Sequence, residues 1–117
     1  MVPVSHLSIL PTVLRDADCL EASLRSLGLH PGRGGRLVGF AGQEVPVELQ
    51  VPVGRGRSLG WQRQSDGTLA LVGDLQRIAA SAPLRSLLGR ITRAYAARHA
   101  LEAAARELPD AVIECQG

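Results

Sequence analysis

The stretch VPVELQVPV, residues 45–53, places an apolar side chain at every second position, with a polar residue or proline between. Successive side chains of a strand point to opposite faces of a sheet, so this period of two predicts a strand with one apolar and one wet face. Antiparallel sheets that are covered on one side have this pattern. The stretch therefore predicts an antiparallel sheet covered on one face only.

The rest of the chain predicts further strands and two helices. Asp16 or Asp18 begins a helix that ends at Gly28, and Pro83 opens a second helix whose apolar stripe runs to Leu108. At 1.5 Å per residue the second helix is about 38 Å long, so we expect one end to overhang the sheet. The expected strands are residues 6–14, 36–40, 45–53, 59–64, 68–74 and 111–115.

This order of elements predicts one α+β domain over residues 1–117. We expect a largely antiparallel, twisted sheet of five to six strands with both helices on one face. The plan looks like a ferredoxin-like βαββαβ arrangement with an inserted hairpin.

The hairpin near Gly67 has a register that the apolar pattern decides. A two-residue turn pairs Trp61 with Val72, whereas a three-residue loop pairs Trp61 with Leu71. The three-residue loop keeps the large apolar side chains on one face, so we expect it, with Gly67 in the left-handed conformation.

The composition excludes several classes of protein. The 117 residues carry a formal net charge of +2, and all 13 basic residues are arginine. So low a charge disfavours nucleic acid as a partner. Cys19 and Cys115 are not spaced as metal ligands, so we expect neither a metal nor a cofactor. No apolar run reaches the ~20 residues that cross a bilayer, and we expect a cytoplasmic protein without a membrane partner.

Catalytic patterns are scarce, and enzymatic activity is not the primary expectation. The sequence has no G-x-S-x-G nucleophile elbow. His6, Asp18, Asp74 and Arg98 form a candidate polar cluster if the fold brings them together. Arg98 interrupts the apolar stripe of the second helix, where its guanidinium either pairs with one of these carboxylates, reaches water along its stem, or meets an anionic partner. An enzyme that uses His6 with a nearby carboxylate is therefore one functional hypothesis, ranked third after the two given below.

Two loops, residues 32–36 and 54–58, combine glycine with arginine. Arg33, Arg36, Arg55 and Arg57 supply planar donor forks, and glycine lets backbone amides approach an anion closely. Both loops lie at connections of the same strands, so their arginines are candidates for one site that binds phosphate ligands or nucleic acid. Flexible, solvated loops are the alternative interpretation.

Several short segments of the chain occur in the same order as in a known protein family. They are SHLSI (5–9), DCL (18–20), VGFAG (38–42), LGW (59–61), DGTLALV (66–72) and RAYA (93–96). In this order they resemble a small family of cyanobacterial proteins that is also encoded in algal plastid genomes and catalogued as a domain of unknown function. Family members carry a tryptophan pair where this chain has Leu75 and Gln76. The resemblance implies a bacterial cytoplasmic or plastid stromal setting and assigns no activity.

Together these patterns predict a small non-catalytic accessory or adaptor protein that acts through protein–protein contacts. The wet face of the sheet, bearing Glu48, Gln50 and Gln62 or Gln64, is the expected surface for a protein partner or a second copy of the chain. Binding of nucleic acid or a phosphate ligand through the two glycine–arginine loops is the second hypothesis.

Overall fold

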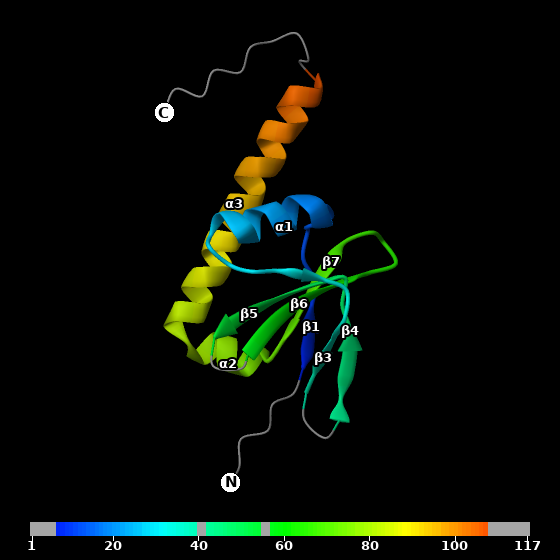
Figure 1. Ribbon diagram of the computed structural model, residues 1–117, viewed down its shortest axis with the longest axis vertical. Coiled ribbons are helices and arrows are strands. Elements are labelled where there is room, and N and C mark those ends of the chain that lie inside the picture. The colour runs from blue at the N-terminus through cyan, green and yellow to red at the C-terminus, as the bar shows by residue number, and fades with distance from the viewer. Residues whose placement is uncertain (1–6, 40–41, 55–56, 108–117) are drawn as a thin grey trace.

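The computed structural model describes residues 7–39, 42–54 and 57–107 (Figure 1). Within them the stretch that decides the fold forms two strands, with a break at Val47 and Glu48. The elements in chain order are β1 (Ser8–Leu10), α1 (Ala17–Ser26), β2 (Gly32–Arg33), β3 (Arg36–Val38), β4 (Glu44–Pro46), β5 (Leu49–Gly54), β6 (Arg57–Arg63), β7 (Leu69–Gly73), α2 (Leu75–Ala80) and α3 (Ala82–Glu107).

The strands form a five-stranded antiparallel sheet in the order β1-β7-β6-β5-β2 and a separate two-stranded sheet of β3 and β4. The α+β class and the antiparallel sheet are therefore confirmed. The neighbours β1, β7 and β6 have the order of the first, third and second strands of a ferredoxin-like sheet. The strand expected at 111–115 lies outside the described residues.

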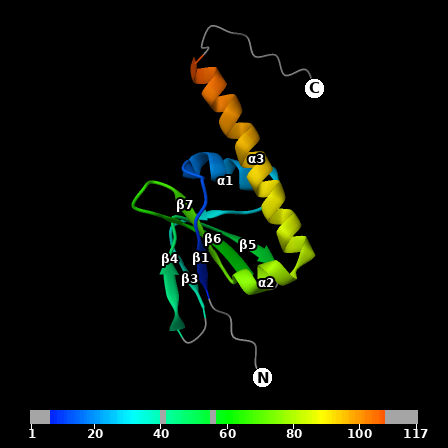
Figure 2. The ribbon, with the colours of Figure 1, turned by 180° about the vertical axis from the view of Figure 1, so that it is seen from behind.

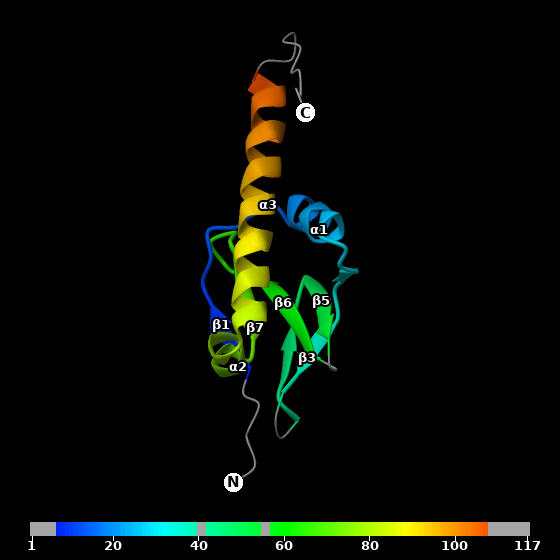
Figure 3. The same ribbon diagram turned by 90° about the vertical axis from the view of Figure 1, so that its left-hand side faces the viewer.

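The helices cover one face of the five-stranded sheet, as expected (Figure 3). Leu20 and Leu24 of α1, Ile78 of α2 and Ile91 and Tyr95 of α3 are buried in one cluster with the sheet. That cluster takes its sheet residues from β5, β6 and β7: Leu49, Val51, Leu59, Trp61, Leu69 and Leu71. Large aliphatic side chains and the single tryptophan thus form the main core.

The second face of the sheet is also covered, by the β3–β4 hairpin. Leu37 of β3, Val45 of β4 and Val47 are buried against Val72 of β7 in a smaller cluster. Every residue of β7 is buried as a result. The expectation of a wet, unoccupied second face was therefore wrong, because the apolar residues of 45–53 are divided between both faces.

The polar residues expected on that free face instead hold the strands and loops together. The side-chain amide of Gln50 donates to the backbone oxygen of Gly34 at 3.0 Å, and that of Gln62 donates to the backbone oxygen of Pro46 at 3.0 Å. Glu48 forms an ion pair with Arg63. These groups fix the β2–β3 segment and β4 to the sheet, so they do not form a free docking face.

The β6–β7 hairpin has the register that the apolar pattern predicts. Trp61 lies opposite Leu71, and the backbone amide of Gln64 donates to the backbone oxygen of Thr68 at 2.8 Å. Gly67 has a φ of 88°, a left-handed conformation that residues with a side chain rarely adopt. The three-residue loop is confirmed.

The helix boundaries agree in part with those expected. Asp16, not Asp18, caps α1, and its carboxylate accepts from the amide of Cys19 at 3.0 Å. Gly28 follows the helix with a φ of 83°, as expected for a left-handed C-terminal residue. The six-residue α2, capped by Asp74, was missed because it buries only Ile78 and so shows no apolar period.

Helix α3 extends well beyond the sheet, as its length predicts (Figures 1 and 2). Its 26 residues correspond to about 39 Å. The Tyr95 hydroxyl accepts from the amides of Arg15 and Asp16 at 3.2 and 3.1 Å, which fixes the middle of α3 to the start of α1. Ile91 and Tyr95 are its buried residues, so its fully buried positions end near the centre of the helix.

The close approach of the β3–β4 hairpin to Gly60 of β6 makes a prediction for stability. A Cβ atom at Gly60 would lie 2.7 Å from a methyl carbon of Val47 and 2.8 Å from one of Leu37. We expect Gly60→Ala to lower the free energy of unfolding by about 1–3 kcal/mol, the usual cost of overpacking. Urea denaturation followed by circular dichroism measures it.

Gly32→Ala is the matched control, since a Cβ atom there meets nothing within 4 Å. We expect it to change the free energy of unfolding by less than about 0.5 kcal/mol, as at an ordinary surface position. Equal stability of both variants would show that the hairpin does not pack against Gly60.

Candidate functional site

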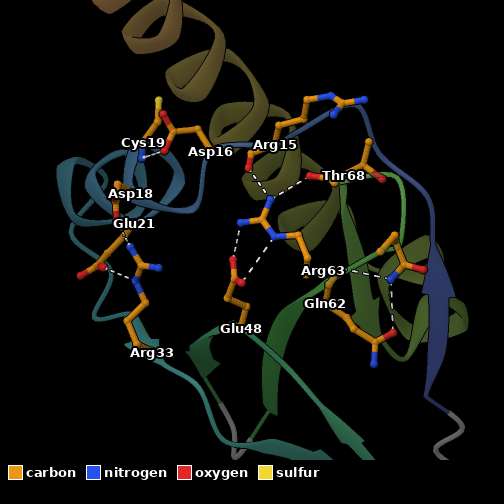
Figure 4. A network of polar contacts seen from close by, with 12 residues as sticks. Arg15, Asp16, Asp18, Cys19, Glu21, Arg33, Glu48, Gln62, Arg63 and Thr68 are labelled. Carbon is orange, nitrogen blue, oxygen red and sulfur yellow. Dashed lines mark hydrogen bonds and ion pairs between the residues drawn. The ribbon is translucent and has the colours of Figure 1, made fainter.

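Arg33 lies at the edge of the sheet and meets two carboxylates of α1 (Figure 4). Its Nε donates to Glu21 at 2.6 Å and its Nη2 to Asp18. Glu21 also accepts from Arg25 at 3.1 Å. Because two carboxylates already neutralise the guanidinium, Arg33 ties β2 to α1 and is poorly placed to bind a further anion.

Arg63 makes a second set of polar contacts beside the first (Figure 4). Its guanidinium pairs with Glu48 and donates to the backbone oxygens of Arg15 and Gly67, the latter at 2.8 Å. An open groove of about 720 Å³ runs between these contacts and Arg33. Three arginines line it opposite three carboxylates: Arg15, Arg33, Arg63, Asp16, Asp18 and Glu48. Its charges compensate one another, so the groove has no net charge to attract a ligand.

A second cavity lies at the end of the sheet beside α2. Arg36 of β3 and Arg57 of β6 both line it, together with Arg77 of α2 and the carboxylate of Asp74. Arg36 pairs with Glu44 at 3.1 Å, and Arg77 pairs with Asp74 at 3.3 Å. The structure thus brings two of the four loop arginines to one cavity and places Arg33 elsewhere. Arg55 lies outside the described residues.

The candidate polar cluster is not assembled around its carboxylates. Asp18 pairs with Arg33 at the start of α1, whereas Asp74 caps α2 at the opposite end of the sheet (Figure 1). Arg98 is partly buried on α3 and forms no ion pair with any described residue. His6 lies outside the described residues. The sequence did not indicate Arg77, because nothing in its spacing separates it from a solvated arginine.

Cys19 is the buried thiol of the described region. It lies between α1 and α3, with its sulfur 3.8 Å from the backbone oxygen of Tyr95. Burial, reinforced by the negative charges of Glu102 and Asp16, raises the pKa of the thiol. A raised pKa keeps the sulfur protonated, so Cys19 packs as a small apolar side chain and is not an activated nucleophile.

The described part of the chain also lacks a clustered set of metal ligands and a helix that could span a membrane. No group of three histidine, cysteine, aspartate or glutamate residues there has an arrangement suited to a metal ion. None of its helices combines the length and apolar character that crossing a bilayer requires.

The ion pairs of Arg33 make a prediction for titration. Hydrogen bonds from Arg33, and then from Arg25, lower the pKa of Glu21. A carboxyl group with a lowered folded-state pKa stabilises the fold above its unfolded pKa, and this stability is lost as the pH falls through the folded value. We expect Arg33→Gln to raise the pKa of Glu21, measured by carboxyl carbon chemical shifts against pH.

Arg25→Gln is the control, since Arg25 is the smaller cause and lies on the same helix as Glu21. It should raise the pKa of Glu21 less than Arg33→Gln does. An equal or larger effect of Arg25→Gln would mean that Arg33 does not hold Glu21 in solution.

Comparison with protein families gives one match. The family described as "Protein of unknown function (DUF1257)" matches residues 23–111, which include the end of α1 and every later element of the described fold. Neither the curated proteins nor the solved structures contain a match to the chain.

Proposed function

The chain belongs to the DUF1257 family of proteins of unknown function, and we propose that it is a non-catalytic adaptor that binds another protein. One observation carries the proposal. The side of α3 that bears Ala94 continues past Tyr95 through Leu101 and Ala105, while the buried residues of the described helix end at Tyr95.

The uncovered part of α3 is unusual for a helix of a small domain. Most of the stability of a protein helix comes from packing its apolar face, and a short isolated helix is marginal in water. After Tyr95 this helix continues for three turns, with Leu101 52% exposed. An exposed leucine on the apolar side of a described helix segment that has no fully buried residue indicates a surface that a partner fills.

The residues beside the stripe define the chemistry of the partner. Small alanine side chains at positions 94, 97 and 105 allow another helix to approach closely. Arg98 and Glu102 place one charge of each sign along one side of the stripe, the side nearer Cys19 of α1. We infer that the partner presents an amphipathic helix with an apolar stripe and charges of both signs beside it.

Other observations support a binding role over catalysis. The thiol of Cys19 is buried and protonated, and both faces of the sheet are filled with side chains. The free end of α3 is therefore the surface most available to a protein. The resemblance to cyanobacterial and plastid reading frames supports a cytoplasmic or stromal setting for this activity.

The proposal is tested by a substitution that introduces a charge into the apolar stripe of α3. We expect Leu101→Glu to weaken the affinity for the partner by about 10-fold to 100-fold, the effect of losing a central apolar contact. The partner is identified by affinity purification from the native host with mass spectrometry. It is then purified, and its binding to each variant is measured by isothermal titration calorimetry.

Ala96→Glu is the matched control, because Ala96 is exposed and lies on the far side of the same helix. Circular dichroism verifies that both variants remain folded. The proposal is supported if the purified partner binds the wild type and Ala96→Glu alike but not Leu101→Glu. Equal binding to both variants contradicts it, and so does a dimer of the chain itself that forms through this surface.

A further inference from the structure

We propose that the cavity between β3, β6 and α2 binds a small organic anion, a carboxylate or phosphate group attached to an apolar body. Helix α2, which lines the cavity, lies at the end of the sheet opposite the far end of α3 (Figure 1). The inference concerns a second site and does not depend on the proposed adaptor role.

The size and walls of the cavity suit a small organic molecule. Its volume is about 330 Å³, at the lower end of the range of about 300–1,000 Å³ for small-molecule sites. Aliphatic side chains from four elements and the start of α3 line it: Leu37, Val53, Leu59, Ile78 and Leu84. An apolar body that fills this space removes hydrocarbon surface from water on both sides.

Three arginines give the cavity its charge. Arg36, Arg57 and Arg77 reach it from β3, β6 and α2, and Asp74 is the carboxylate in its lining. Both oxygens of Asp74 are already engaged. One accepts from the backbone amide of Arg77 at 3.2 Å, and the other pairs with the Arg77 side chain at 3.3 Å.

Arg57 is the cation that this arrangement leaves uncompensated. Arg36 has Glu44 at 3.1 Å and Arg77 has Asp74, whereas no carboxylate of the described residues lies within ion-pair distance of Arg57. A guanidinium binds carboxylate or phosphate oxygens through parallel hydrogen bonds. An anion placed here neutralises Arg57 while the attached body contacts the apolar wall.

The larger groove beside α1 is a weaker candidate for the same role. Its three arginines face three carboxylates, and Arg33 and Arg63 are already paired. The cavity beside α2 differs because apolar walls and an uncompensated cation occur together.

A pair of fluorescent probes separates the contribution of the anionic group to binding from that of the apolar body. The first probe is 1-anilinonaphthalene-8-sulfonate, and the second is N-phenyl-1-naphthylamine, which has the same rings without the anionic group. We expect the sulfonate to bind the folded protein saturably at one site and at least about tenfold more tightly than the amine. Chemical shift changes in the NMR spectrum should centre on Val53, Leu59 and Ile78.

Arg57→Gln should lower the affinity of the protein for the sulfonate probe by about tenfold, the loss expected for one charge-assisted contact. Arg90→Gln is the matched control, since Arg90 is exposed on α3 and does not line the cavity. Thermal unfolding verifies that both variants are folded. Equal affinity of the two variants, equal binding of the two probes, or shift changes centred elsewhere would overturn the proposal.

Competition against the bound sulfonate then distinguishes the head groups. Phenyl phosphate and phenylacetate have similar bodies, and inorganic phosphate has none. Displacement by either aromatic anion, but not by inorganic phosphate at the same concentration, supports the site. The stronger competitor identifies phosphate or carboxylate as the preferred group. Displacement by inorganic phosphate alone, or by none of the three, contradicts it.

Discussion

The packing of Leu37 and Val47 against the bare backbone of Gly60 decides how this small domain is closed. Any side chain at Gly60 would overlap the hairpin, so glycine allows β3 and β4 to lie directly on the second face of the sheet. With helices on the other face, both sides of β7 are buried. The surfaces that remain for binding are consequently at the ends of the molecule, along the last turns of α3 and in the cavity beside α2.

Much of the fold could be predicted from local patterns. The period of two in residues 45–53, the register of the β6–β7 hairpin and the length of α3 all follow from where apolar side chains must point. The break at Val47 and Glu48 did not follow. Alternation fixes which residues share a face of one strand, but it cannot show that the strand changes sheets and carries Val45 and Val47 to the opposite side.

The site was harder to predict, because the partner of an arginine depends on tertiary contacts. Arg33, Arg36 and Arg57 have the same local setting of glycine and strand ends in the sequence. In the fold Arg33 meets Asp18 and Glu21, fifteen and twelve positions away, Arg36 meets Glu44 across a hairpin, and Arg57 lines a cavity with Arg77. Composition indicated that arginine clusters were present, and only the topology shows which of them keep an unpaired charge.

The contact between the Tyr95 hydroxyl and the start of α1 divides α3 into two segments of different local stability. Amide protons before this contact exchange with solvent only when the main core opens, because Ile91 and Tyr95 are packed within that core. Among the described residues beyond it no side chain of α3 is fully buried, so the amide protons there depend mainly on helical hydrogen bonds, which fray where tertiary packing is sparse. A partner that binds the free segment therefore also folds it more firmly, and part of its binding energy is used to order those turns.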